Sequence, residues 1–282
     1  MPRSEEKICR DIREIDRDYV EGYLPEAQIY YEFGIYDQIT SLLQTPVGGT
    51  HLNLCSGPFF IEEAVKRQHP QVAVAGVDLN PEMIKAAQLT LSGLRAQYRT
   101  HANGVLKFSQ FLVNDEGEPL HYWEYPLDFS DIPDFLDSNG PIEIIQGDVT
   151  KEAVIQAILQ GKMLDSASFS FLGSSGSNLL EASARTRELR DVEFYNRCLE
   201  AKWKEILDEV YRQLSKYVKI DGEIVIGERC DDPDKIIEQM GRNKKYWTPV
   251  EIIQTVAPHQ GEFSIMPILI QRFIRNSIPF QN

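Results

Sequence analysis

Short apolar segments alternate with helix-like segments along most of the chain, and this alternation restricts the fold more than any other feature. Five segments have the composition of strands: residues 51–56, 72–77, 142–145, 167–172 and 223–227. A continuously apolar strand, such as the second of these, is typical of a parallel sheet that is covered on both faces. Strands that alternate with helices through short connections form a doubly wound sheet. We therefore predict an α/β fold with a doubly wound, mostly parallel sheet.

Helical periodicity and turn residues complete this prediction. Residues 60–68 carry apolar side chains on one helical face, and Asn80-Pro81 has the composition of a helix start. A long amphipathic helix is expected over residues 191–218. Two further apolar segments, 252–256 and 265–273, are separated by a short turn. They predict an antiparallel hairpin that closes one edge of the sheet.

Two segments do not fit the alternation. Residues 99–141 are too long for a connection between a helix and a strand. Within them, residues 105–113 and 120–125 flank a polar turn, which predicts an inserted hairpin. The first 40 residues precede the first strand and have a helical pattern that ends in a group of aromatic residues.

We predict the following organisation. Residues 1–45 form an N-terminal helical segment that covers the site as a lid. Residues 46–282 form one large domain, into which residues 99–141 are inserted as a second cap.

The net charge of −14 is concentrated in these two additions. Residues 1–40 contain 10 acidic and 5 basic side chains, and residues 99–141 contain 8 and 2. Such acidity argues against a general nucleic-acid partner, which needs a basic face, and against docking on an anionic membrane. One hypothesis is that the acidic segments attract an amine substrate and that Tyr30, Tyr31, Tyr36 and Trp123 contact its cation. The alternatives are that the acidity serves solubility and that the tyrosines pack the helix.

The cysteines and histidines do not form a metal-binding pattern. The four cysteines are scattered without a C-x-x-C pair, and the five histidines contain no i, i+4 pair. We therefore expect no metal. Unpaired cysteines, a charged start of the chain and the lack of an apolar run of roughly 18 residues lead us to expect a cytoplasmic protein.

Polar residues follow the first three strands at the edge where an open α/β sheet binds its ligands. The first strand ends in a tight turn, Cys55-Ser-Gly-Pro58. Asp78 follows the second strand, about 20 residues later, where a carboxylate can accept hydrogen bonds from a ribose. Asp148 follows the third. The alternatives are that Asp78 only caps the helix starting at Pro81 and that Asp148 is the N-cap of a helix from Lys151.

This arrangement resembles the class I S-adenosylmethionine-dependent methyltransferases. Their glycine-rich first motif corresponds to LNLCSGPF at residues 52–59, and their ribose-binding acid to Asp78. Their acid after the third strand corresponds to Asp148, and their turn before the fifth strand to KIDG at residues 219–222. The resemblance implies S-adenosylmethionine (SAM) as the cofactor. The cofactor-binding residues it implies are Asn53, Cys55, Ser56, Gly57, Pro58, Asp78, Leu79, Met83, Asp148, Val149, Phe171 and Leu172.

The first motif departs from the family pattern at three positions. Asn53 replaces an acid, and Cys55 and Phe59 replace the first and last glycines, so that only Gly57 remains. The departures leave open a loop with altered contacts to the cofactor, or a non-catalytic scaffold that no longer binds it tightly. A dinucleotide site is disfavoured, because G-x-G-x-x-G is missing and Phe59-Phe60 would block the pyrophosphate.

The resemblance also indicates where the methyl acceptor binds. The loop after the fourth strand lacks the N/D-P-P-Y signature of nucleic-acid amino methyltransferases, so a small-molecule substrate is expected. The candidate substrate residues are Tyr30, Tyr31, Tyr36, Ser174, Ser175 and Asn178. His101, His121 and Glu228 are candidates for a general base, although the histidines could equally be ordinary surface residues. Transfer of another group from SAM is a further alternative.

Overall fold

The computed structural model describes residues 5–80, 83–84, 96–98, 109–113, 119–124, 142–171, 192–258 and 265–280. An eight-stranded sheet forms the core, with the order β3-β6-β2-β1-β7-β8-β10-β9. Its strands are β1 Thr50–Leu54, β2 Ala73–Asp78, β3 Ala96–Tyr98, β6 Ile142–Gln146, β7 Leu164–Ser170, β8 Val218–Glu228, β9 Trp247–Pro258 and β10 Ile265–Arg275.

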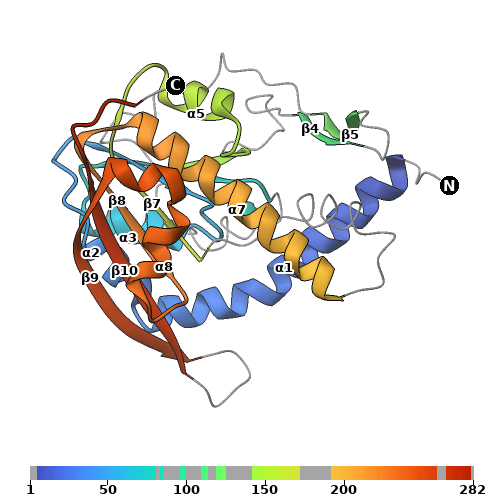
Figure 1. Ribbon diagram of the computed structural model, residues 1–282, viewed down its shortest axis with the longest axis horizontal. Helices are drawn as coiled ribbons and strands as arrows, with labels where there is room; N and C mark the ends of the chain where they lie inside the picture. The colour runs from blue at the N-terminus through green and yellow to red at the C-terminus, as the bar shows by residue number, and fades with distance from the viewer. Residues whose placement is uncertain are drawn as a thin grey trace.

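The strand order turns at β1, which pairs in parallel with β2 on one side and with β7 on the other. β3, β6 and β8 continue the parallel pairing outward, and β10 and β9 add an antiparallel hairpin beyond β8. Figure 1 shows this hairpin as two long curved strands at one side of the molecule. The predicted doubly wound, mostly parallel sheet and its C-terminal hairpin are confirmed.

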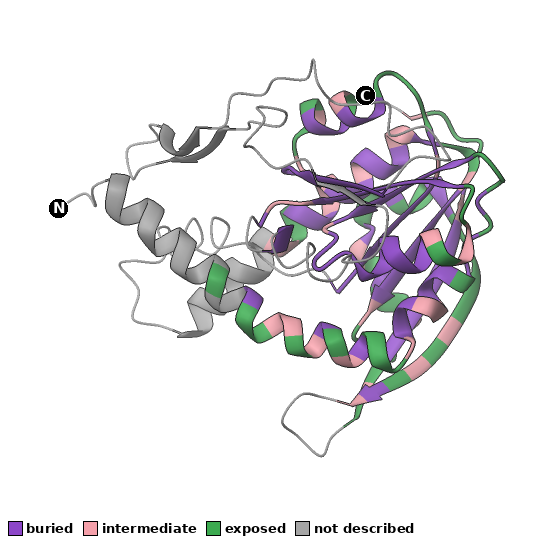
Figure 2. Cartoon of the chain, turned by 180° about the vertical axis from the view of Figure 1, so that it is seen from behind, coloured by how far each residue is buried: buried purple, intermediate pink, exposed green. Residues whose placement is uncertain are grey.

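Helices cover both faces of the sheet. They are α1 Glu5–Glu32, α2 Ile35–Ser41, α3 Phe60–Gln68, α5 Glu152–Leu159, α7 Val192–Tyr217 and α8 Pro233–Gln239, with a 3-10 helix at Gly241–Tyr246. Alternate strand residues face opposite sides. Ile224 and Ile226 pack with α5, α7 and α8, whereas Val225 packs with α1, α2 and α3. The two helical layers bury the strands, as the purple interior in Figure 2 shows.

Most predicted boundaries lie within two residues of those in the structure, but β7, β8 and β9 begin three to five residues earlier than predicted. The fourth strand begins at Leu164 rather than Ala167 and ends at Ser170, because Leu164 still pairs with β8 and Ser166 with both β1 and β8. The fifth begins at Val218, so the predicted turn 219–222 lies within β8 as an irregularity with Asp221 at φ 63°. β3, α8 and the 3-10 helix were not predicted.

The two predicted additions are present as helix and hairpin. α1 and α2 occupy the N-terminal segment, and β4 Ser109–Val113 pairs antiparallel with β5 Pro119–Glu124. The hairpin stands apart from the main sheet and contacts α1 (Figure 1). The acidic helix and the acidic insertion therefore meet each other.

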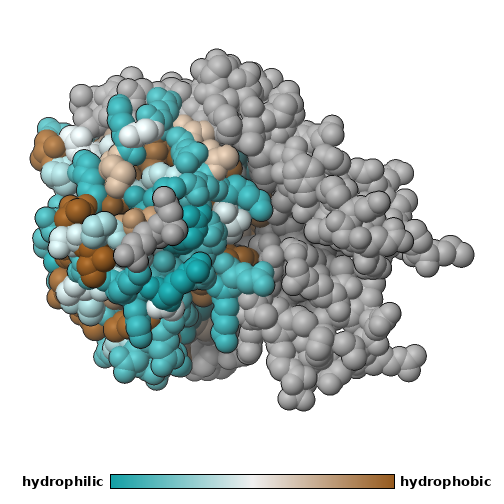
Figure 3. Space-filling view, turned by 45° about the horizontal axis from the view of Figure 1, so that its top comes forward, coloured by the Kyte–Doolittle hydropathy of each residue, from teal (hydrophilic) through white to brown (hydrophobic). Residues whose placement is uncertain are grey.

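The described surface shows no large apolar area in the view of Figure 3, where hydrophilic residues surround separate apolar ones. Among the described residues, no helix combines the length and apolar character needed to cross a membrane. Within the same residues, no group of three or more His, Cys, Asp and Glu side chains is placed to hold a metal ion.

Candidate cofactor site

The turn after β1 has a left-handed backbone at each position where the family resemblance places glycine. Cys55, Gly57 and Phe59 have φ of 55°, 56° and 64°. Left-handed conformations are strained for residues with a Cβ, at about 1–2 kcal/mol each. Cys55 and Phe59 therefore adopt this conformation at an energetic cost.

This cost leads to a prediction about Cys55. We expect Cys55→Gly to be more stable than Cys55→Ala by about 1 kcal/mol, because only glycine adopts the left-handed conformation without strain. At an unstrained site the order would be reversed. Urea unfolding of the two variants measures the difference, and a more stable alanine variant would contradict the prediction.

Asp78, at the end of β2, is joined to this turn. Its Oδ2 accepts a hydrogen bond from the Gly57 amide at 2.8 Å, and its Oδ1 accepts one from the Asn80 amide at 2.8 Å. Burial raises the pKa of Asp78 to about 6, although the three backbone hydrogen bonds it accepts partly oppose this. Asp78 therefore does more than cap a helix starting at Pro81, because its side chain also links the end of β2 to the turn after β1. Each oxygen retains lone-pair capacity for a further donor.

The end of β6 completes the edge. The Gly147 amide donates to the Asp78 carbonyl oxygen at 2.9 Å, which links the second and third strand ends. Asp148 accepts from the Thr150 amide and hydroxyl, and Lys151 is the N-cap of α5, so the N-cap alternative for Asp148 is wrong. Burial is the main cause that raises the pKa of the Cys55 thiol, and the charges of Asp78 and Asp148 raise it further. Both carboxyl groups therefore lie near enough to Cys55 for their charges to act on it.

Aromatic side chains form a continuous row beside this edge. Adjacent ring centroids lie 4.7–6.3 Å apart along the series Tyr31, Phe60, Tyr36, Phe171 and Tyr30. Tyr30 and Tyr36 are buried, whereas Tyr31 is partly exposed at the outer end. Of the predicted substrate tyrosines, Tyr30 and Tyr36 thus contact Phe171, which directly follows β7, whereas Tyr31 contacts Phe60.

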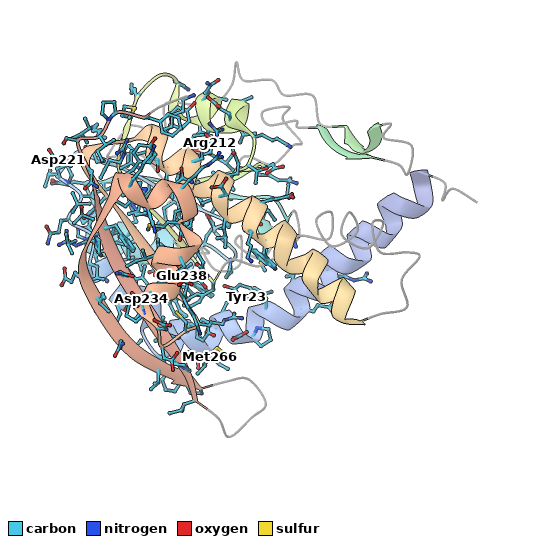
Figure 4. The ribbon with its side chains drawn as sticks, viewed as in Figure 1. Tyr23, Arg212, Asp221, Asp234, Glu238 and Met266 are labelled. Atoms are coloured by element: carbon cyan, nitrogen blue, oxygen red, sulfur yellow. The ribbon has the colours of Figure 1, made fainter. Side chains whose placement is uncertain are left out.

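Tyr23 extends this arrangement over the glycine turn. A Cβ on Gly57 would lie 3.3 Å from the Tyr23 ring. Figure 4 labels Tyr23 on α1, away from Asp221, which lies in the first part of β8. α1 therefore passes over the turn that follows β1.

The aromatic residues already surround a cation that belongs to the protein. The Arg229 guanidinium lies 5.6–5.9 Å from the ring centroids of Tyr23, Tyr30 and Phe171. It also forms an ion pair with Glu26 at 3.1 Å, and about a third of its side chain (34%) is exposed. The Tyr30 hydroxyl donates to the same Glu26 carboxylate at 2.5 Å. The rings thus serve a cation–π role within the chain itself.

The remaining predicted residues lie in different parts of the chain. Ser56, Pro58, Met83 and Val149 are buried near the strand ends, and Leu79 is partly exposed. Burial raises the pKa of Glu228, at the end of β8, to about 7, a value suited to a general base. His121 lies on β5, in the hairpin that stands apart from the sheet. His101, Leu172, Ser174, Ser175 and Asn178 lie outside the described residues.

Sequence reasoning missed four site residues: Tyr23, Glu26, Glu62 and Arg229. A helical signal was available for α1, where Val20, Tyr23, Ala27 and Tyr30 share one face. Glu62 and Arg229 had no comparable signal, since neither an acid in the first turn of a helix nor an arginine after a strand is unusual.

The strand order defines the fold of this chain. It is the class I SAM-dependent methyltransferase fold, and the turn after β1 and the acids after β2 and β6 lie at the edge where the resemblance places the cofactor. The residues at this edge fit the cofactor in one respect, because Asp78 retains acceptor capacity for hydroxyl groups. No phosphate group is required.

Solved structures share this fold. A chain from the complex of the Haloferax volcanii Trm112 methyltransferase activator with its methyltransferase is 9% identical, with a TM-score of 0.50 over 96% of this chain and 100% of that one. TrmN from Thermus thermophilus is 8% identical (TM-score 0.48, 85% of this chain), and the chain spans about half (48%) of its length. A TehB-like SAM-dependent methyltransferase from Corynebacterium glutamicum is 12% identical (TM-score 0.45, 92% and 100%). No protein-family model and no curated protein sequence matches the chain.

Proposed function

We propose that the protein is a SAM-dependent methyltransferase that acts on a small molecule. The observation that carries the proposal is the turn at residues 55–59, whose three left-handed positions are tied through Gly57 to the carboxylate of Asp78. Strain in a turn persists when the surrounding structure enforces it, and such strain is concentrated at binding sites. A scaffold without a ligand has no evident reason to retain it.

Each residue of the edge would have a defined task. Asp78 would accept hydrogen bonds from the ribose hydroxyls, Gly57 would allow close approach of the backbone, and Asp148 would receive a polar donor from the base. Bound SAM supplies an electrophilic methyl group. The chain's part is to position the acceptor, exclude water and, where the acceptor carries a proton, remove it through a base such as Glu228.

The acceptor would enter beside the aromatic row and α1. The acidic N-terminal and inserted segments support an amine or amino-acid-like acceptor through long-range attraction. The aromatic rings add less support than expected from the sequence, because Arg229 already occupies their cation–π contacts. An amino acid suits both features: its amine is attracted by the acidic segments, and its carboxylate can pair with Arg229.

Calorimetry with SAM and S-adenosylhomocysteine (SAH) tests the cofactor assignment. We expect both to bind the full chain with micromolar affinity or better, since Asp78 and Asp148 would bind the ribose and the base. Failure of both to bind would support the non-catalytic scaffold. Binding without methyl transfer to any amine, amino-acid or hydroxyl acceptor would favour transfer of another group.

A further inference from the structure

A series of hydrogen-bonded polar side chains crosses the apolar core below the cofactor turn. It starts at Thr45 and continues through β7 and β1 to α3. The successive oxygen and nitrogen atoms lie 2.5–3.0 Å apart in the pairs Thr45–Ser166, Ser166–His51, His51–Ser168, Ser168–Asn53 and Asn53–Glu62. Every member is buried. Buried polar groups are costly unless they are paired, so this series calls for an explanation.

The hydrogen bonds of the series all point in one direction, from Thr45 toward Glu62. Burial lowers the pKa of His51 to about 3, so its ring is neutral and has one donor and one acceptor nitrogen. Ser168 donates to Asn53 Oδ1, and Asn53 Nδ2 donates to Glu62 Oε1. Ser168 therefore accepts from His51, and His51 accepts from Ser166. The series ends on the carboxyl group of Glu62.

Glu62 is fully buried and only partly satisfied. Its Oε1 accepts from Asn53, whereas its Oε2 has no hydrogen-bond partner. The carboxyl group fits because residue 76 is glycine: a Cβ there would lie 1.9 Å from Glu62 Oε1 and 2.6 Å from Ser56 Oγ. Burial raises the pKa of Glu62 to about 8, with opposing hydrogen bonds from Ser56 and Asn53. A proton on the unpartnered Oε2 would leave Oε1 able to accept from Asn53.

The cofactor turn lies between two acidic groups. Glu62 interacts with Ser56, and Asp78 binds the amide of Gly57. On β2, the charge of Asp78 raises the pKa of Glu62. On β1, Glu62 faces the neutral side chain of Asn53, which is connected through Ser168 to the neutral ring of His51. On α3 itself, Glu63 pairs with Arg67 instead. A positive charge placed on this turn would therefore favour ionisation of Glu62.

We propose that Glu62 is a positioning residue of the cofactor site, which holds the turn through Asn53 and Ser56 and loses its proton to solvent when a cationic cofactor binds. The inference rests on the proposed function. SAM carries a sulfonium charge that SAH lacks, so the two ligands should differ in the proton they displace. Asp78, with a pKa of about 6, is already ionised above pH 7 and contributes little to this difference.

Calorimetry of the full chain at pH 7.5 in buffers of different ionisation enthalpy measures the protons released. We expect about half a proton or more on binding SAM and less on binding SAH. Glu62→Gln should bind SAM with release close to zero, and the neighbouring Glu63→Gln should behave as wild type. Equal release by wild type and Glu62→Gln would overturn the inference. Failure of wild type to bind either ligand would instead refute the proposed function, and the inference with it.

Exchanging the carboxyl and amide groups gives a second test. Asn53→Asp alone places two acids against each other and should weaken SAH binding about tenfold or more. The double variant Asn53→Asp/Glu62→Gln restores a carboxyl–amide pair and should bind within about threefold of wild type. Because the double variant keeps the hydrogen-bond count, it remains informative if a single variant folds poorly. No rescue of affinity in a folded double variant would overturn the positioning role.

Discussion

Asp78→Asn is expected to weaken SAH binding about 10- to 100-fold, which is the effect of losing charged hydrogen bonds to a ligand's hydroxyl groups. The amide has one acceptor oxygen where the carboxylate has two, and its NH2 group would face the amide of Gly57 or Asn80. The turn and the ligand both lose an acceptor. Calorimetric titration with SAH measures the affinity. Asp37→Asn, at an exposed ion pair with Arg67, is the matched control and should leave it unchanged.

The same residue predicts a pH dependence. Burial raises the pKa of Asp78 to about 6, so the ionised form that accepts ribose hydrogen bonds is lost as the pH falls through 6. We expect SAH affinity to decrease from pH 7 to pH 5 in the wild type and to change much less in Asp78→Asn. An unchanged affinity over this range would rule out the ribose role of Asp78.

Tyr30→Ala is expected to destabilise the protein by about 3–5 kcal/mol, the usual cost of removing a buried aromatic side chain. Tyr30 is fully buried, and its ring centroid lies 4.7 Å from that of Phe171. It also lies beside Arg229 and Glu26. These contacts attach α1 to the end of β7. Urea unfolding measures the loss, and hydrogen exchange should show that α1 opens first.

Two variants separate the ring from its hydroxyl and from its position on the helix. Tyr30→Phe removes the hydrogen bond to Glu26 and should cost only about 1 kcal/mol. Tyr31→Ala removes the adjacent, partly exposed ring and should cost about 1 kcal/mol or less. Similar losses for Tyr30→Ala and Tyr31→Ala would show that Tyr30 does not anchor α1.

The fold could be predicted because its signal lies in local patterns. Residues 60–68 were predicted as a helix with these exact ends, and the long helix was predicted to within one residue at each end. β7 was predicted to begin at Ala167 instead of Leu164, since Asp165 and Ser166 are polar and the burial of Ser166 depends on His51, a partner distant in sequence. β3 has three residues, fewer than periodicity can identify.

The site was predictable only where its residues follow strands. Asp78 and Asp148 lie at the predicted edge, because parallel strands end on the same side of the sheet. Arg229 and Glu26 come from opposite ends of the chain, and their ion pair depends on how α1 crosses β8. The replacement of the strand acid by Asn53 was visible, but the carboxyl group of Glu62 beside it required the three-dimensional structure.

The turn at residues 55–59 has a consequence for how distant relatives are recognised. A sequence motif of three glycines names the residue type that adopts a left-handed backbone most easily. A ligand would contact the backbone conformation and not the residue type. Here cysteine and phenylalanine adopt that backbone, and Phe59 uses its side chain to fill the core under β2 and β6. The left-handed conformation of this turn therefore does not depend on glycine. Turns of this kind that contain core-filling residues should be sought by conformation.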